Sequence, residues 1–191
     1  MKNHFYAMLS RMKNIYRWGL MRNTKSENLS EHSLETAYVA HALAIIKNNC
    51  FGGNVNASKA AVAAMFHDTS EIITGDMPTP VKYYNPQIKS VYKDIEKQAQ
   101  QTLTDMLPDY MRTDISNIYD DNDAEIKQIV KAADKISAYI KCVEELNMGN
   151  REFATAEKTI KKAIKEMNMP EADLFMKDFI PSFNLSLDEK K

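Results

Sequence analysis

The sequence predicts an all-α fold, a single-domain helical bundle. Apolar residues recur at helical spacing in the long segments, and no segment alternates apolar and polar residues as a half-buried strand would. The 191 residues include only five glycines and six prolines, which favours long helices over many tight turns. We expect one domain over residues 1–191, with a polar C-terminal tail at about 184–191.

The N-terminal half contains three expected helices, at about 3–16, 31–49 and 57–73. Ser30 is a suitable N-cap for the second helix, and Asn56 for the third. Gly75 stands where a C-cap glycine belongs. Residues 76–80 include two prolines and are expected to form a loop, because proline disfavours helix at and before its own position.

The C-terminal half contains four further expected helices, at about 86–107, 124–146, 151–167 and 171–179. Residues 114–123 are acidic and are expected to form a solvated loop. Counting from Asp120, the sixth residue is Glu125 instead of glycine and the twelfth is Lys131 instead of glutamate. The EF-hand pattern therefore fails, and we expect no calcium loop there.

Composition excludes several classes of function. The formal net charge is −1 and the pI is near 6.4, so no basic face marks the chain as a partner of nucleic-acid polymers. No stretch approaches the roughly 20 apolar residues that span a bilayer, and the N-terminus lacks the apolar block of a signal peptide. Two cysteines without a CxxC spacing fit a reducing compartment. We expect a cytoplasmic protein.

Four residues form a candidate metal-binding set: His32, the pair His67-Asp68, and Asp134. The pair stands late in a segment whose other positions suit a buried helix, and a buried charge is costly without a partner. A divalent metal is a natural partner, since neutral imidazole and carboxylate both ligate one. The mixed set suits Mn, Fe, Co, Zn or Mg, and it leaves room for water and substrate on an octahedral ion.

Helical geometry adds Glu71 to this set. At about 100° per residue, Asp68 lies about 100° and Glu71 about 40° from His67, so all three side chains would point into one sector. Each residue also has an ordinary explanation. A lone histidine on an apolar face is usually a core residue, and Asp134 beside two lysines could form a surface ion pair. His41 lies about 180° round the helix from His32, so we assign it no role.

The order His…His-Asp…Asp on a helical background resembles the HD-domain metal-dependent phosphohydrolases. Further stretches resemble the bacterial 5′-deoxynucleotidase subgroup: Arg17-Trp18, Asn-Leu-Ser-Glu-His-Ser-Leu at 28–34, Met-Phe-His-Asp-Thr-Ser-Glu at 65–71, Thr-Gly-Asp-Met-Pro-Thr-Pro-Val-Lys at 74–82 and Pro-Ser-Phe-Asn-Leu-Ser-Leu-Asp-Glu at 181–189. The resemblance covers essentially the whole chain and is weakest at about 108–123.

The resemblance implies a metal-dependent hydrolase that releases deoxynucleoside and phosphate from deoxyribonucleoside 5′-monophosphates and selects against ribonucleotides. It places the acid–base carboxylate on Glu71 and the phosphate-orienting arginine on Arg17. The implied ligands of one divalent ion, cobalt, manganese or similar, are His32, His67, Asp68 and Asp134. The implied substrate-binding residues are Arg17, Trp18, His32, Asp68, Asp76, Met77, Pro78, Thr79 and Asp134, with Trp18 discriminating the sugar. The resemblance also implies a homodimer.

Two other functions are compatible with parts of this pattern. An HD phosphohydrolase could act on a nucleoside triphosphate or a signalling nucleotide, and its products would then include triphosphate or pyrophosphate. A non-catalytic helical module that binds a nucleotide or a protein would be expected to lack ligands or the acid–base carboxylate, yet all are present. A purely structural metal is disfavoured, because structural zinc sites usually use cysteine and histidine.

Overall fold

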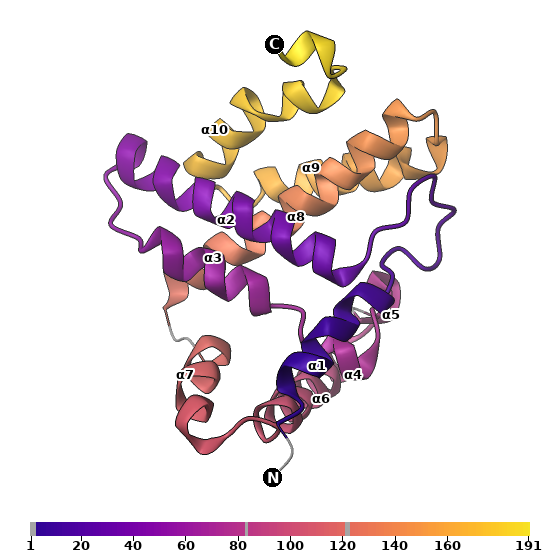
Figure 1. Ribbon diagram of the computed structural model, residues 1–191. Helices are drawn as coiled ribbons and strands as arrows, with labels where there is room; N and C mark the ends of the chain where they lie inside the picture. Colours follow the sequence, from indigo (N-terminus) through magenta and orange to yellow (C-terminus); the bar gives the residue numbers. More distant parts are fainter. Residues whose placement is uncertain (1–2, 83, 121–122) are drawn as a thin grey trace. The chain divides into compact units, whose positions relative to one another are not determined.

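The computed structural model describes residues 3–82, 84–120 and 123–191 (Figure 1). Within these ranges it is helical, and its only extended pairing is an isolated antiparallel bridge between Tyr16 and Asn28. The α-helices are α1 (Phe5–Leu9), α2 (Leu29–Phe51), α3 (Ala57–Phe66), α4 (Glu71–Thr74), α5 (Thr79–Lys82), α6 (Pro86–Thr104), α7 (Asp109–Tyr119), α8 (Ala124–Asn147), α9 (Ala154–Lys165) and α10 (Pro170–Asp178). Short 3-10 helices are η1 (Ser10–Asn14), η2 (Arg151–Phe153), η3 (Ile180–Asn184) and η4 (Asp188–Lys190). The predicted all-α class is confirmed.

Backbone contacts divide the chain into two compact units. The first unit comprises Met1–Arg22, Ser26–Ser33 and Phe66–Asp121. The second comprises Asn23–Lys25, Leu34–Met65 and Asn122–Lys191. Helix α2 therefore begins in the first unit and continues in the second. No helix within the described ranges combines the length and the apolar content needed to cross a membrane.

The first unit is built around α6, which contacts α1, α4, α5 and α7. Its small core consists of the buried residues Phe5, Leu103, Leu107 and Ile115, with Phe66 and other partly buried side chains against them. The side chain of Asn85 caps α6 by accepting from the backbone amide of Ile88 at 2.8 Å, and Pro86 supplies a preset first turn. This core supports the short helix α4, on which part of the candidate site stands.

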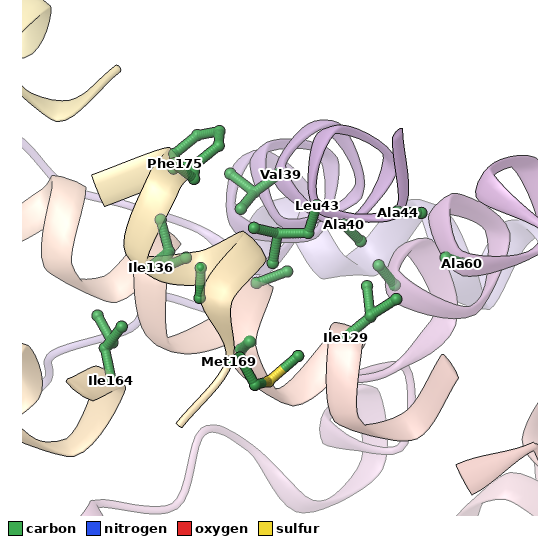
Figure 2. Packing of buried hydrophobic residues seen from close by; sticks show 14 of the residues in the cluster. Val39, Ala40, Leu43, Ala44, Ala60, Ile129, Ile136, Ile164, Met169 and Phe175 are labelled. Carbon is green, nitrogen blue, oxygen red and sulfur yellow. The ribbon is translucent and has the colours of Figure 1, made fainter. Parts of the chain in front are cut away.

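The second unit has the larger core, formed by α2, α3, α8, α9 and α10 (Figure 2). Figure 2 shows Val39 and Leu43 of α2 among Ile129 and Ile136 of α8 and Phe175 of α10. Several alanines on α2, α3 and α8 are completely buried, including Ala40, Ala44, Ala60, Ala64, Ala132 and Ala133. Side chains this small allow the backbones of neighbouring helices to approach closely.

The expected helix over about 57–73 is wrong as a continuous element. Helix α3 ends at Phe66, residues 67–70 form a turn, and α4 begins at Glu71. The hydroxyl of Thr69 donates to the Phe66 carbonyl oxygen at 2.9 Å and to the Tyr119 hydroxyl at 3.0 Å. A threonine side chain that bonds the backbone nearby competes with helix continuation. Gly75, with φ 73°, ends α4 as predicted.

The expected loop over 114–123 is wrong over 114–119, because α7 continues to Tyr119, and residues 121–122 lie outside the described residues. One side of α7 is apolar: Ile115 is buried in the core of the first unit, with Met111 and Ile118 packed against the same cluster. Asp114, the acidic residue between these positions, is exposed and is compatible with a helix. The acidic residues of this segment made its apolar periodicity hard to recognise, which is why the sequence predicted a loop.

Two smaller predictions also differ from the structure. Helix α2 begins at Leu29, so Ser30 lies inside it, and Asn28 takes the capping role by accepting from the amides of Ser30 at 3.0 Å and Glu31 at 3.1 Å. The expected loop over 76–80 is shorter, because α5 begins at Thr79. Its second residue is Pro80, and the first turn of a helix tolerates proline since the missing N–H has no partner there.

A buried ion pair lies on α8 in the second unit. Lys141 and Glu145 stand one helical turn apart, and the Lys141 ammonium donates to the Glu145 carboxylate and to the Lys25 carbonyl oxygen. Glu145 also accepts from the backbone amides of Thr24 at 2.8 Å and Lys25 at 3.1 Å, and from the Asn150 amide at 2.8 Å. These bonds fix the segment that lies between the candidate site residues Trp18 and His32 in sequence.

We expect Glu145→Gln to lower the free energy of unfolding by about 3–5 kcal/mol, because it leaves the Lys141 charge buried without a carboxylate. Burial alone would raise the pKa of Glu145, but Lys141 and the other donors lower it to about 2. The pair therefore stabilises the fold above the ordinary carboxyl pKa of the unfolded chain, and this contribution is lost as pH falls toward 2.

Urea unfolding at pH 7 and pH 3, followed by circular dichroism, measures both effects. The matched control is Glu166→Gln, because Glu166 and Lys162 have the same one-turn spacing at 3.7 Å but are 65% and 77% exposed. This control should change the free energy of unfolding by less than about 1 kcal/mol. Equal losses in the two variants would contradict the prediction.

Candidate active site and metal centre

Three of the four predicted metal ligands come together in the first unit. His32 lies in the first turn of α2 and is completely buried, while His67 and Asp68 stand in the turn between α3 and α4. Each offers one ligand atom, and these three atoms lie within 4.8 Å of one another. Nε2 of His67 is 3.1 Å and Nε2 of His32 is 3.6 Å from Oδ2 of Asp68. Two nitrogens and one oxygen at this spacing suit a single divalent ion.

Asp68 stands at the centre of this cluster. Besides the two imidazoles, its Oδ2 accepts a hydrogen bond from Nη1 of Arg17 at 3.1 Å. Burial alone would raise the pKa of Asp68, but His67, His32 and Arg17 hold it well below its usual range. The group is therefore a carboxylate, which is the form that ligates a metal.

Glu71 is the first residue of α4 and is only 4% exposed. Its Oε2 atom is buried and has no hydrogen-bond partner among the residues that the structure describes. Burial and the neighbouring carboxylates of Asp68 and Asp76 raise the pKa of Glu71 to about 9. A buried carboxyl oxygen without a protein partner needs a water molecule or an ion as its partner. His32, His67, Asp68 and Glu71 therefore fit a metal ion with a bound water molecule beside it.

The Arg17-Trp18 segment is held by antiparallel pairing with the residues before α2. The Tyr16–Asn28 bridge is accompanied by a hydrogen bond from the Arg17 amide to the Glu27 carbonyl oxygen at 2.9 Å. Trp18 follows with φ 61°, a left-handed backbone conformation that is unusual for a bulky residue. Its indole Nε1 donates to Oε2 of Glu27 at 2.7 Å. The half-buried Trp18 ring is therefore held in one place.

Sequence reasoning missed Glu27, which the structure places between three of the predicted site residues. The Oε2 atom of this buried carboxylate contacts the Trp18 indole and lies 3.5 Å from Nε of Arg17. The Oε1 atom lies 3.5 Å from Nδ1 of His32. Burial alone would raise the pKa of Glu27, but His32, Arg17 and Trp18 lower it below its usual value. The sequence signal for Glu27 is weak, since it is only an acidic residue five positions before the candidate ligand His32. The bridge between Tyr16 and Asn28, which brings Glu27 to Arg17, cannot be inferred from periodicity.

The predicted substrate loop follows α4. Asp76, Met77 and Pro78 are half-buried, and Thr79 is exposed at the start of α5. Burial and the charge of Asp68 raise the pKa of Asp76, while a hydrogen bond with the backbone of Trp18 acts in the opposite direction. The structure therefore places Asp76 beside Trp18. The contacts of all four residues with a substrate stay predictions.

Asp134 lies on α8 in the second unit, half-buried beside the completely buried Ala133. The three clustered ligands belong to the first unit. The assignment of Asp134 as a fourth metal ligand and as a substrate contact therefore stays a prediction.

Comparison with known proteins identifies the family. The sequence model of the 5′-deoxynucleotidase YfbR-like family matches residues 4–183. The chain belongs to the YfbR-like 5′-deoxynucleotidase family. It is 55% identical over 190 residues to a 5′-deoxynucleotidase of Vibrio vulnificus strain YJ016, covering 98% of each protein. It is likewise 55% identical over 189 residues to a 5′-deoxynucleotidase of Photorhabdus laumondii, covering 98% of this chain and 96% of the relative.

Solved structures of less similar proteins share the fold of this chain. An HD-domain phosphohydrolase from Listeria innocua superposes with a TM-score of 0.83 at 22% identity, covering 100% of this chain and 94% of the other. An HD phosphohydrolase of cyanophage S-2L, bound to dA and one catalytic Zn²⁺ ion, superposes with a TM-score of 0.67 at 18% identity, covering 92% and 96%. The HD-type all-α fold and the hydrolase class predicted from sequence are confirmed.

Proposed function

We propose that this YfbR-like enzyme hydrolyses deoxyribonucleoside 5′-monophosphates to deoxynucleoside and phosphate, and that it selects against ribonucleotides. The observation that carries the proposal is the convergence of His32, His67 and Asp68 next to Arg17 and the partnerless carboxyl oxygen of Glu71. The names of relatives at 55% identity and the dA bound to a more distant phosphohydrolase support this choice of substrate.

The proposed metal site consists of His32, His67 and Asp68, with Asp134 as a fourth ligand. A divalent ion bound there would lower the pKa of water and withdraw electrons from a phosphoryl oxygen. Cobalt, manganese or a similar ion suits this mixture of imidazole and carboxylate donors, which is not selective for one element.

The proposed reaction is direct hydrolysis, with no covalent intermediate on the enzyme. A divalent ion bound beside Glu71 would lower its pKa from about 9 and favour the ionised form. The ionised Glu71 would orient a water molecule and accept its proton as the water oxygen bonds to phosphorus. The bond between phosphorus and the 5′-oxygen breaks on the opposite side, and the 5′-oxygen takes up a proton to leave as the deoxynucleoside hydroxyl. Arg17 offers several N–H donors in one plane, so it can bind phosphate oxygens while also contacting Asp68.

The proposed sugar site lies at Trp18 and Asp76. A rigid indole ring beside the 2′ position would collide with a ribose hydroxyl, and Asp76 would accept a hydrogen bond from the 3′-hydroxyl. Met77, Pro78 and Thr79 complete this loop. The left-handed backbone of Trp18 supports the proposal, because unusual conformations held by surrounding contacts are common in binding sites.

Phosphate release from dAMP and AMP tests the function. After treatment with a chelator, single divalent ions are added back, and we expect phosphate release from dAMP to exceed that from AMP by about 100-fold. Trp18→Ala should lower this preference by about tenfold or more, because the ring that excludes the 2′-hydroxyl is gone. The matched control is Tyr110→Ala, since Tyr110 is an aromatic residue of α7 that is 83% exposed.

Two outcomes would contradict the proposal. Metal binding without phosphate release from either nucleotide would exclude a monophosphatase. Release of triphosphate or pyrophosphate from larger nucleotides would assign the enzyme to another HD phosphohydrolase activity. A preference for dAMP that survives Trp18→Ala would remove Trp18 from the sugar site.

We further propose that the protein is a homodimer and acts in the cytoplasm. The dimer is supported by the family resemblance. The cytoplasmic location is supported by the work of such enzymes on nucleotides and by the sequence, because two cysteines without a CxxC spacing fit a reducing compartment.

A further inference from the structure

We propose that Glu27 is a positioning residue that couples sugar selection to the metal centre by holding Trp18 and His32 at the same time. The inference rests on the proposed function. Its basis is the use of both carboxylate oxygens: Oε2 accepts from the Trp18 indole at 2.7 Å, and Oε1 faces Nδ1 of His32 at 3.5 Å. Glu27 is 7% exposed, so water competes little for these contacts.

The contact with His32 decides which imidazole nitrogen is offered to a metal. Nδ1 faces Glu27, and Nε2 is directed to Asp68 at 3.6 Å. A carboxylate at Nδ1 favours the tautomer with the proton on that nitrogen, which leaves the lone pair of Nε2 for a ligand bond. Partners of this kind also fix the ring orientation of a ligating histidine, and His32 is completely buried.

The contact with Trp18 holds a residue whose backbone is strained. The left-handed φ of 61° persists only where neighbouring contacts enforce it. Those contacts include the indole bond to the Glu27 side chain, the Arg17 amide bond to the Glu27 carbonyl oxygen at 2.9 Å, and the Met21 amide bond to the Trp18 carbonyl oxygen at 2.9 Å. Two of these three contacts are made by Glu27.

Arg17 completes a closed ring of contacts. Its Nε lies 3.5 Å from Oε2 of Glu27, and its Nη1 donates to Asp68 at 3.1 Å. Glu27 and Asp68 each contact both Arg17 and His32, so the guanidinium and the imidazole are held between two carboxylates. Removal of the Glu27 charge should therefore affect the sugar-selecting residue and the metal ligand together, which a residue that merely fills space would not do.

The test uses Glu27→Gln, which keeps the size of the side chain and removes its charge. Trp18 is the only tryptophan of the chain, so its fluorescence reports the position of this ring directly in the metal-free protein. We expect acrylamide quenching of Trp18 to increase at least about twofold. Co²⁺ affinity, measured by calorimetry, should fall by about 10–100-fold, the usual effect of losing an outer-shell partner of a metal ligand. The preference for dAMP over AMP should fall as well.

The matched control is Glu31→Gln, because Glu31 is an exposed glutamate four residues further along the same segment. It should leave quenching, Co²⁺ affinity and nucleotide preference unchanged. Glu27→Asp serves as a second variant with the charge retained on a shorter arm, and a loss of both Trp18 protection and Co²⁺ affinity in it supports the double contact. If Glu27→Gln does not fold, quenching and calorimetry on Glu27→Asp test the proposal instead.

Glu27 has no positioning role if both Glu27 variants bind Co²⁺ and protect Trp18 as the wild type does. If Glu27→Gln changes only the quenching of Trp18 or only the Co²⁺ affinity, the proposed coupling is wrong. It is also wrong if the wild-type protein binds no Co²⁺. Quenching and calorimetry need no substrate. A failure of the deoxynucleotidase proposal, seen as Co²⁺ binding without phosphate release, is therefore distinguishable from a failure of the Glu27 proposal.

Discussion

Replacing Glu71 with glutamine is expected to reduce kcat for phosphate release from dAMP by about 10²–10⁴-fold, the usual contribution of a general base. The substitution keeps the size of the side chain but removes its ability to accept a proton. Because Oε2 of Glu71 is buried and has no partner among the described residues, the wild-type carboxylate is available to a water molecule. The free energy of unfolding should not fall, since Glu71, with its pKa raised to about 9, is a neutral acid at pH 7 in the metal-free protein, and glutamine is also uncharged.

The decisive comparison is between turnover and metal binding. Phosphate release is measured for wild type, Glu71→Gln and the control Glu31→Gln, and Co²⁺ affinity is measured on the same samples. We expect Glu71→Gln to lose turnover while binding Co²⁺ within a few-fold of wild type. A variant that retains more than about a tenth of wild-type kcat would remove Glu71 from proton transfer. Loss of Co²⁺ binding in this variant would instead make Glu71 a ligand.

Replacing Asp68 with asparagine is expected to weaken Co²⁺ binding by more than about 100-fold, because loss of a ligand should exceed the 10–100-fold effect of outer-shell partners. Phosphate release should fall to the level of the chelator-treated wild type. Asp68 carries the negative charge nearest to both histidines and Arg17, and its Oδ2 atom contacts all three side chains. Removal of this charge takes away the carboxylate that contacts both imidazoles and Arg17, while Glu27 still contacts His32 and Arg17.

Calorimetry with Co²⁺ and phosphate release from dAMP measure this prediction. Asp105→Asn is the control in the same unit, since Asp105 is exposed and its carboxylate accepts from Gln101 at 2.8 Å. Asp134→Asn belongs in the same series, and a comparable loss of affinity there would support the fourth ligand. Undiminished Co²⁺ binding by Asp68→Asn would show that the three clustered residues are not the metal site.

Helix α8 illustrates what could be predicted from the sequence with little error. The expected range was about 124–146, and the observed helix is Ala124–Asn147. Apolar residues at helical spacing run through its whole length, and Asp123 caps it by accepting from the amides of Glu125 at 3.0 Å and Ile126 at 3.2 Å. A long periodic pattern with a strong cap needs no information from the rest of the chain.

The turn at His67-Asp68 shows where prediction from the sequence was incomplete. The angles between His67, Asp68 and Glu71 were derived for one continuous helix, yet α3 ends before this pair. The hydrogen bond between Thr69 and Tyr119, which accompanies the break, joins residues 50 positions apart. The turn uses i,i+3 backbone bonds and stays compact, so His67, Asp68 and Glu71 remain within one short stretch of chain. Their common direction toward one ion stays a prediction.

The sequence by itself determined the helical class, because periodicity is a local property, and its motifs pointed to the family by resemblance. It also proposed His32, His67 and Asp68, which the structure brings within 4.8 Å of one another. Only the tertiary structure decided that α7 is a helix, since burial of Ile115 in a core outweighs an acidic composition. Only the tertiary structure revealed Glu27, because the pairing of Tyr16 with Asn28 brings that carboxylate to Arg17, Trp18 and His32. Contacts between distant segments depend on how the chain closes on itself, and no local pattern in a single sequence records them.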